Sequence, residues 1–210
     1  GGAGYIGSVL TELLLHKGFK VTIVDTFRFS EDSLNHLISD ENLDVLKVDA
    51  RSISKDILSK QDYIIPLAAI VGAPACQMYQ DEAISTNKDA ILKILENIND
   101  NQKIIFPTTN SGYGTTSGDL YCDETTPLNP ISLYGKLKKE IETTIMKREN
   151  SVCFRLATVF GVSGRMRTDL LVNDFVYKAY NEKSLILFES HFKRNYIHIQ
   201  DISDAMIKIL

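Results

Sequence analysis

The chain has 210 residues, a formal net charge of −4 and a hydrophobic fraction of 44%. These values are typical of an ordinary globular protein, and Lys and Arg are scattered rather than gathered in the basic stripe that nucleic-acid binding requires. No apolar run approaches the roughly 18 residues of a membrane span. Three widely spaced cysteines match neither a disulfide framework nor a zinc site, which favours a reducing compartment. We therefore expect a cytoplasmic protein that binds neither nucleic acid nor a membrane, with no metal site.

Short β-rich segments alternate with segments of helical periodicity. The expected strands are 20–25, 44–49, 62–68, 103–108 and 151–157, and the expected helices are 5–17, 30–39, 79–99 and 132–149. Because parallel strands need crossover helices and are covered on both faces, this alternation predicts an α/β fold with a doubly wound parallel sheet. Further along, the sequence predicts a helix near 168–182, short strands near 185–188 and 194–199, and a helix that runs to Leu210.

The first seven residues carry glycines with the spacing of a dinucleotide-binding turn. Gly2, Gly4 and Gly7 fit G-x-G-x-x-G, and Gly1, Gly4 and Gly7 fit the related G-x-x-G-x-x-G. Such glycines let the backbone approach a pyrophosphate at the N-terminus of the helix that follows. The next expected strand ends in Asp25, whose carboxylate suits the 2′-hydroxyl of an adenosine ribose. The sequence therefore predicts NAD as the cofactor.

A turn of this kind normally follows a buried strand in the middle of the sheet. Without that strand, its neighbours would keep unsatisfied backbone groups. The expectation is therefore that the natural chain begins upstream with an apolar strand. We expect residues 1–160 to form a Rossmann-type NAD-binding domain that lacks this first strand. Residues 161–210 would form the start of a smaller C-terminal substrate lobe, with a helix that returns to the first domain.

A second cluster follows the stretch 109–131, which is rich in Gly, Thr, Asn and Pro and is long enough to suggest a functional loop. Tyr134 and Lys138 are four residues apart on the next expected helix, so their side chains share a face. A neighbouring ammonium group favours the phenolate form of a tyrosine, which turns a poor base into a usable one. The spacing alone is weak evidence, because it arises readily by chance. Its place after a long loop and downstream of a cofactor turn gives it weight.

Several stretches together resemble the extended short-chain dehydrogenase/reductases, specifically the nucleotide-sugar epimerase/dehydratase family. They are GGAGYIG at 1–7, Asp25, LAA at 67–69, TTNSGYG at 108–114, PISLYGKLK at 130–138, RLATVFG at 155–161 and RNYIHIQD at 194–201. The resemblance covers the whole chain and implies bound NAD, a nucleoside-diphosphate sugar as substrate, and a homodimer.

The resemblance also implies roles for individual residues. Tyr134 would deprotonate the sugar 4-hydroxyl, Lys138 would lower the pKa of the phenol and hold the nicotinamide ribose, and Thr109 would bind the same sugar oxygen. The cofactor-binding set would be Gly1, Gly4, Tyr5, Ile6, Gly7, Asp25, Asp49, Ala50, Leu67, Ala68, Ala69, Asn87, Tyr134 and Lys138. The substrate-binding set would be Thr109, Asn110, Ser111, Asn173 and Arg194.

Three kinds of reaction in the family compete: 4,6-dehydration, 3,5-epimerisation and reversible hydride transfer at C4. A 3,5-epimerase would carry a cysteine at the position of Ser111, which disfavours that reaction. The 4,6-dehydratases of the family carry Asp and Glu directly after the active-site threonine, as general acid and general base. This chain has Asn110 and Ser111 at these positions, and neither side chain can do that work, which disfavours a 4,6-dehydratase. A 4-epimerase and an NADP-dependent 4-ketoreductase both remain open. Asp25 favours NAD and hence the epimerase, while Arg28 would suit the 2′-phosphate of NADP. A non-catalytic scaffold on the same fold is a further alternative, against which an intact catalytic set argues.

Two more features leave alternatives open. Arg165 and Arg167 form an extra cationic pair on the substrate side, which suits either a phosphate or acidic sugar or a merely solvated loop. Cys76 is interpreted as a packed, inert thiol, because no cationic residue adjacent in sequence would lower its pKa.

Overall fold

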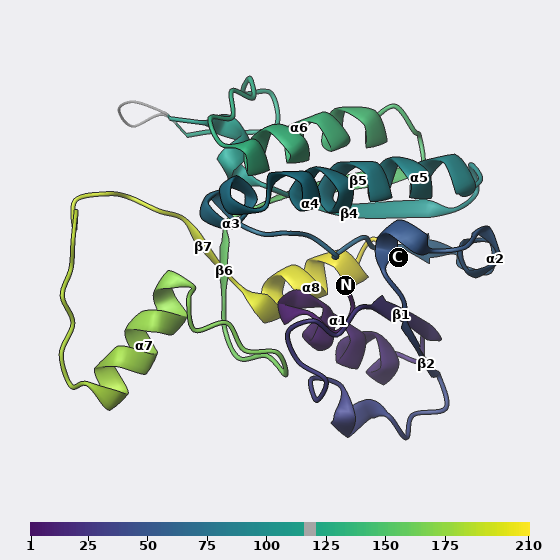
Figure 1. The fold of residues 1–210 in the computed structure, drawn as a ribbon, viewed down its shortest axis with the longest axis horizontal. Helices are drawn as coiled ribbons and strands as arrows, with labels where there is room; N and C mark the ends of the chain where they lie inside the picture. Colours follow the sequence, from purple (N-terminus) through teal and green to yellow (C-terminus); the bar gives the residue numbers. More distant parts are fainter. Residues whose placement is uncertain (116–120) are drawn as a thin grey trace. The chain divides into compact units, whose positions relative to one another are not determined.

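The computed structural model describes residues 1–115 and 121–210 (Figure 1). These residues divide into two compact units. Unit 1 comprises Gly1, Val24–Thr26 and Leu46–Arg155, and unit 2 comprises Gly2–Ile23, Phe27–Val45 and Leu156–Leu210. Within the described ranges, no helix combines the length and apolar character needed to cross a bilayer.

Unit 1 is built around a three-stranded sheet with the order β3-β4-β5. Its strands are β3 (Tyr63–Ile64), β4 (Lys103–Thr109) and β5 (Ser151–Leu156), and its helices are α2 (Lys55–Leu58), α3 (Ala73–Met78), α4 (Gln80–Ile84), α5 (Ala90–Asn97) and α6 (Leu133–Ile145). β3 and β4 run parallel, with Ile64 opposite Ile104. Short helical turns complete the unit: η2 (Ala50–Ser52), η3 (Ser85–Asp89) and η4 (Asn110–Tyr113).

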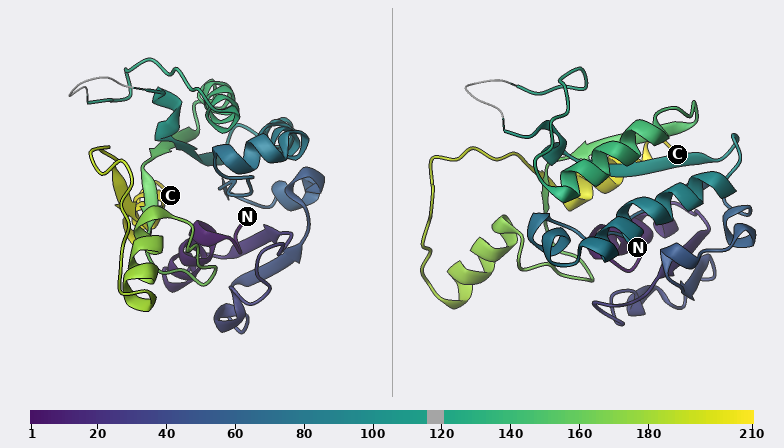
Figure 2. Two further views of the ribbon diagram at one scale, coloured as in Figure 1. Left: turned by 60° about the vertical axis from the view of Figure 1, so that its left-hand side comes forward. Right: turned by 45° about the horizontal axis from the view of Figure 1, so that its top comes forward.

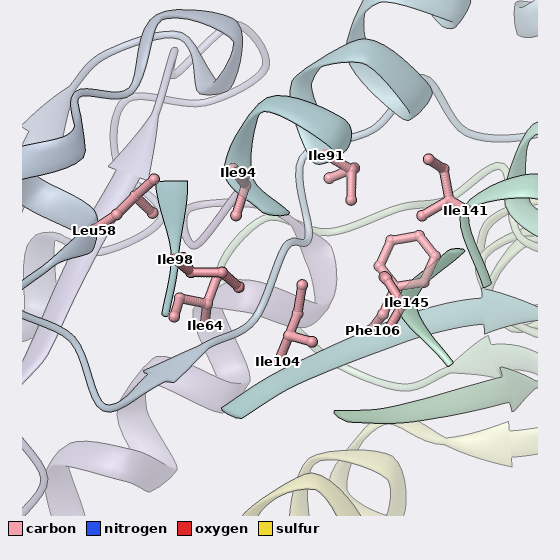
Figure 3. Packing of buried hydrophobic residues seen from close by; sticks show 9 residues of the cluster. All are labelled: Leu58, Ile64, Ile91, Ile94, Ile98, Ile104, Phe106, Ile141 and Ile145. Atoms are coloured by element: carbon pink, nitrogen blue, oxygen red, sulfur yellow. The ribbon is translucent and has the colours of Figure 1, made fainter. Parts of the chain in front are cut away.

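The core of unit 1 lies where α5 and α6 cover β4 (Figure 3). The two helices lie side by side (Figure 2). The buried cluster consists of Leu58, Ile64, Ile91, Ile94, Ile98, Ile104, Phe106, Ile141 and Ile145. Each such side chain contributes roughly 1.5–3 kcal/mol when it is removed from water. This packing fixes the end of β4 relative to the start of α6, where the predicted catalytic residues lie.

Unit 2 contains α1 (Tyr5–His16), the turn η1 (Asn35–Leu37), β6 (Thr158–Phe160), α7 (Leu171–Asn181), β7 (Tyr196–His198) and α8 (Ile199–Ile207). β6 and β7 pair in parallel, and α1 packs against α8 (Figure 2). A small core of Ala3, Leu15, Ile23, Leu34 and Leu37 includes residues just before α1 and in its last turn.

The strands β1 (Val21–Asp25) and β2 (Leu43–Lys47) pair with each other. The α/β class with parallel pairing is as predicted, but the described strands form three hydrogen-bonded groups rather than one continuous sheet. Gly1 contacts two of the segments concerned. Its nitrogen donates to the carbonyl of Val24, and its backbone packs directly on that of Leu67 and Ala68. The glycine turn therefore begins between β1 and the segment that follows β3.

Other predicted boundaries need correction. The expected strand 62–68 is reduced to β3, and the backbone of Leu67 and Ala68 beyond it packs on Gly1. The expected helix 30–39 is only the short turn η1. There the Ser30 hydroxyl accepts a bond from the Asp32 nitrogen, and the Asp32 carboxylate accepts one from Asn35. Such side-chain bonds to nearby groups compete with helix formation.

The expected helix 79–99 is observed as the consecutive elements α4, the π-helical turn η3, and α5, from Gln80 to Asn97. Tyr79, whose backbone angles of −121° and 59° are not helical, separates them from α3. The expected strand 185–188 is absent from the described residues, and the side chains of Ile186 and Phe188 are exposed there. The division of the chain at residue 160 remains a prediction.

Candidate active site

The glycine turn leads into an uncapped helix. Gly4 is the N-cap of α1, no side chain caps this end, and the described first turn carries no acidic residue. The first N–H groups of a helix lack internal partners and attract anions. A Cβ on Gly1 would lie 2.2 Å from the nitrogen of Ala68, so only glycine allows this approach. These features fit a dinucleotide pyrophosphate.

The segment that follows Leu67–Ala69 is held by one amide. Asn87, 2% exposed in η3, accepts a 2.8 Å bond from the nitrogen of Ile70 and donates a 2.8 Å bond to its carbonyl. The Cys76 thiol donates to the same carbonyl at 3.2 Å. Cys76 is fully buried, and burial raises its pKa, which supports its interpretation as an inert thiol. Asn87 therefore fixes the backbone directly after the predicted cofactor-lining residues.

Tyr134 and Lys138 lie on the first turns of α6. The helix begins at this point because the Ser132 hydroxyl accepts a 3.1 Å bond from the nitrogen of Gly135. The Lys138 ammonium lies 6.0 Å from the centroid of the Tyr134 ring. It also donates a 2.8 Å bond to the carbonyl of Pro107 and lies 4.3 Å from the centroid of Phe106. The predicted pair thus shares one face, as its spacing requires.

Burial lowers the pKa of Lys138 from its ordinary 10.5 to about 8. The side chain is 5% exposed, and desolvation disfavours its charged form. Nearby Cys153 and Cys76 act in the opposite direction. At pH 7 the group is still mostly protonated, so it presents a positive charge near the Tyr134 ring. That charge stabilises a phenolate electrostatically.

Thr109 ends β4 and begins the turn η4. Its side chain is 9% exposed and accepts a 3.1 Å bond from the nitrogen of Ser111. The first turn of α6 packs on this turn, since a Cβ on Gly135 would lie 3.3 Å from the Ser111 carbonyl. The structure therefore brings the predicted substrate residues Thr109 and Ser111, with Asn110 between them, next to the predicted base on α6.

A cluster that the sequence analysis did not single out lies behind α6. Arg155 on β5 pairs with Glu142 through bonds of 2.8 and 2.7 Å and donates at 3.1 Å to the hydroxyl of Tyr113. The same guanidinium donates to the carbonyl of Glu124 at 3.3 Å, and Tyr113 donates to that of Asp123 at 2.9 Å. Arg155 begins one of the motifs that carry the resemblance, but the residues that it contacts lie far from it in sequence, so the cluster could not be predicted.

The two predicted acids of unit 1 differ in their surroundings. Asp25 ends β1, and its carbonyl accepts a 3.0 Å bond from Val48. Asp49 uses both carboxylate oxygens for Arg51, at 3.0 and 2.6 Å, and this contact lowers the pKa of Asp49. Ala50 begins the turn η2 directly after it. The assignment of Asp49 to an adenine amine remains a prediction, and the amine would share the carboxylate with Arg51.

The remaining predicted residues belong to unit 2. Asn173 is 6% exposed and lies on α7, whereas Arg194 is exposed just before β7. Arg167 pairs with Asp169, and Arg165 lies over the ring of Phe29 at 4.5 Å. These contacts favour neither interpretation of the arginine pair. The assignments of Tyr5, Ile6, Asn173 and Arg194 remain predictions.

Comparison with known proteins identifies the family of the chain. Residues 1–210 match the NAD dependent epimerase/dehydratase family. UDP-glucuronic acid decarboxylase 1 of Danio rerio is 25% identical over 223 residues, covering 100% of this chain and 52% of the relative. The chain thus spans about half the length of that relative.

Solved structures show the same fold. The UDP-N-acetylglucosamine 4-epimerase of Methanobrevibacter ruminantium, solved with UDP-N-acetylmuramic acid, is 25% identical with a TM-score of 0.87, covering 98% of this chain and 69% of its own. The UDP-glucuronic acid 4-epimerase of Bacillus cereus, solved with NAD, is 24% identical with a TM-score of 0.85, covering 99% and 70%. The predicted Rossmann-like fold and an NAD-dependent family are therefore confirmed. The relatives named here are a decarboxylase and epimerases of UDP-sugars, and the chain belongs to the NAD-dependent epimerase/dehydratase family.

Proposed function

We propose that this protein is an NAD-dependent nucleotide-sugar 4-epimerase. The observation that carries the proposal is the position of the Lys138 ammonium, 6.0 Å from the centroid of the Tyr134 ring and hydrogen-bonded to the carbonyl two residues before Thr109. Burying a charged group beside a phenol at the end of a strand costs free energy, and groups held at such a cost are typical of functional sites. This arrangement supports removal of a proton from a sugar hydroxyl.

The proposed reaction assigns each side chain one task. Tyr134, as phenolate, takes the proton of the 4-hydroxyl, and the positive charge of Lys138 stabilises that phenolate. Because Thr109 uses its oxygen to accept the bond from Ser111, its hydroxyl proton can be donated to the same sugar oxygen. Bound NAD supplies the hydride acceptor at C4. Return of the proton by Tyr134 when the opposite face of C4 is reduced completes the inversion.

The residues that would hold NAD are the first turn of α1, the acids Asp25 and Asp49, the segment 67–69, and Lys138. In the proposed site the N–H groups at the uncapped end of α1 bind the pyrophosphate. Asp25 accepts from the ribose, which favours NAD over NADP. Asn87 contributes by fixing the backbone that follows the segment 67–69.

A second candidate is decarboxylation of a nucleotide-linked uronic acid. It is favoured by the relatives, because UDP-glucuronic acid decarboxylase 1 of Danio rerio matches the full chain. Oxidation at C4 would place a ketone β to the C5 carboxylate, and loss of CO₂ from such an acid needs no further base. The same Tyr134, Lys138 and Thr109 would serve this first step.

The test is to incubate the purified protein with NAD⁺ and UDP-glucose, UDP-N-acetylglucosamine or UDP-glucuronic acid, and to identify products by NMR. A C4 epimer supports the proposal, and CO₂ release with a UDP-pentose supports the second candidate. Tyr134→Phe should lower either rate by about 10²–10⁴-fold, whereas Tyr79→Phe, on a half-exposed tyrosine, serves as control. Turnover of none of these sugars, or of CDP-, GDP- and dTDP-linked sugars, would contradict the proposal.

We also propose a cytoplasmic homodimer. The three cysteines are free, which suits a reducing compartment. Sedimentation velocity of the purified protein tests the oligomeric state, and a monomer at micromolar concentration would refute the dimer.

A further inference from the structure

The first turn of α1 is tied to residues 161–163 by a buried hydrogen-bond network within unit 2. The Tyr5 hydroxyl donates a 2.8 Å bond to the carbonyl of Gly161, and the Ser163 hydroxyl donates a 2.7 Å bond to the carbonyl of Tyr5. Ser163 also shares a 2.9 Å bond with Ser8. Tyr5, Ser8 and Ser163 are all buried. The residue that begins the cofactor-side helix thus contacts the start of the predicted substrate region through both its side chain and its backbone.

Asn173 joins this network from α7. Its amide oxygen accepts a 3.0 Å bond from the nitrogen of Gly161. Its amide nitrogen donates to the Tyr5 hydroxyl at 3.0 Å and to the carbonyl of Arg167 at 2.9 Å. Asn173 is the buried residue of α7, whose other described side chains are at least partly exposed. The network therefore anchors α7 as well as the segment between Gly161 and Arg167.

The hydrogen-bond inventory of Asn173 decides what it can do. A phosphate oxygen only accepts hydrogen bonds, and a primary amide has two N–H donors. Both donors of Asn173 are used, by Tyr5 and by Arg167. Direct binding of a diphosphate would require one of these buried bonds to break, which leaves a buried acceptor unsatisfied.

We propose that Tyr5 and Asn173 are a positioning pair: the Tyr5 hydroxyl holds the Asn173 amide, and together they fix residues 161–173 in the conformation that binds the nucleotide of the substrate. The designation of this segment as substrate-binding rests on the proposed function. Tyr5 itself would meet the cofactor only through its backbone, so its hydroxyl serves the substrate side.

Two other properties of the network agree with this role. Gly161 has a φ of +129°, and a Cβ there would lie 2.7 Å from Ile199 and 2.8 Å from the His198 ring. The backbone at Gly161 is therefore closely packed against these two side chains. Burial raises the pKa of Tyr5. The phenol therefore stays neutral at physiological pH and keeps the proton that it donates to Gly161.

The test compares Tyr5→Phe, Asn173→Ala and the double variant, all loaded with NAD⁺. We expect hydrogen exchange in 161–173 to accelerate about tenfold in Tyr5→Phe, because one buried bond to each of two partners is lost. The affinity for UDP should fall about tenfold in each single variant and little further in the double variant, while the affinity for NAD⁺ stays within about twofold in Tyr5→Phe. Tyr180→Phe, on the exposed side of α7, should match the wild type in all three measurements.

Direct binding of the diphosphate by Asn173 predicts a different set of affinities. If Asn173 bound the diphosphate directly, Tyr5→Phe would free a donor and leave the UDP affinity unchanged or tighter, whereas Asn173→Ala would weaken it. That result, or unchanged exchange in Tyr5→Phe, would overturn the positioning pair. A protein that binds UDP but converts no sugar would refute the proposed function alone. If the wild type bound no UDP, the exchange measurement would still decide the role of Tyr5.

Discussion

The ammonium of Lys138 donates a 2.8 Å hydrogen bond to the main-chain carbonyl of Pro107. The ammonium also lies near the ring faces of Phe106 and Tyr134, and burial lowers its pKa to about 8. One neutral acceptor replaces only part of the hydration that a cation loses on burial. Lys138 therefore occupies its position at a cost to stability.

The first prediction follows from this cost. Replacing Lys138 by Met should raise the free energy of unfolding at pH 7 by about 2 kcal/mol. Lowering the pKa of Lys138 to about 8 corresponds to about 3 kcal/mol of destabilisation, which the substitution removes, and the unpaired Pro107 carbonyl costs about 1 kcal/mol of that gain. The variant should nevertheless lose the proposed activity. Urea denaturation measures the first effect, with Lys136→Met, an exposed position on the same helix, as control. If Lys138→Met were less stable than the wild type, burial of the lysine would not be destabilising.

The second prediction concerns pH. The pKa of Lys138 is about 8 in the folded state against 10.5 as its ordinary value, so between these values the unfolded chain binds more protons. The destabilisation is complete below pH 8 and disappears as pH rises towards 10.5. The stability gap between Lys138→Met and the wild type should therefore shrink from pH 7 to pH 10. Burial also raises the pKa of the nearby thiols, Cys76 and Cys153. Both proteins contain these thiols, so the measured difference mainly reports Lys138. A gap that is constant with pH would contradict the prediction.

The third prediction concerns the ion pair of Arg155 and Glu142. Removing one partner of a buried pair leaves an uncompensated charge, and replacing both by apolar residues avoids this. Arg155→Met should therefore cost about 3 kcal/mol of stability, and the double variant with Glu142→Met should recover most of it. Urea midpoints measure both. Because Arg155 also holds the carbonyl of Glu124, both variants should be cleaved faster by protease near 121–126. Equal stability of the two variants would argue against a buried charge effect.

The sequence predicts those parts of the site that are formed by side chains on one helix, and not those that depend on main-chain atoms of distant segments. Tyr134 and Lys138 were predictable because their spacing places two side chains on one helix face. The acceptor of Lys138 was not, because it is a main-chain carbonyl on a strand distant in sequence. The same limit applies to the contacts of Asn87: the resemblance named this residue, but its partners are the backbone of Ile70 and the Cys76 thiol.

The fold shows a similar division. Long periodic segments such as that of α6 were predicted to within a few residues at each end. The segment around Leu34 and Leu37 has apolar residues at helical spacing, and these two are buried as expected. The bonds among Ser30, Asp32 and Asn35 nevertheless hold that segment in turns. Periodicity predicted which residues are buried there, and local polar bonds determined the backbone.

The fourth prediction concerns thiol reactivity. Cys76 is fully buried, and burial raises the pKa of Cys153 to about 12, while Cys122 is partly exposed. Because the thiolate is the reactive form, iodoacetamide at pH 7.5 should modify Cys122 in the native protein well before the other two. Mass spectrometry of tryptic peptides measures the order. Modification of Cys153 at the rate of Cys122 would show that β5 opens readily or that the thiol is not buried.

The last prediction separates two glycines by what a methyl group would meet. A Cβ on Gly1 would lie 2.2 Å from the nitrogen of Ala68 and 2.5 Å from the carbonyl carbon of Leu67, both backbone atoms that cannot yield without moving the segment 67–69. Gly1→Ala should therefore displace the predicted cofactor-lining backbone and weaken NAD⁺ binding by more than about tenfold. Gly18 has a φ of +82° with nothing within 4 Å of a Cβ, so Gly18→Ala should cost about 1 kcal/mol of stability through backbone strain and leave NAD⁺ affinity unchanged. Calorimetric titration of both variants with NAD⁺ makes the comparison. Wild-type affinity in Gly1→Ala would mean that this close approach has no part in binding the dinucleotide.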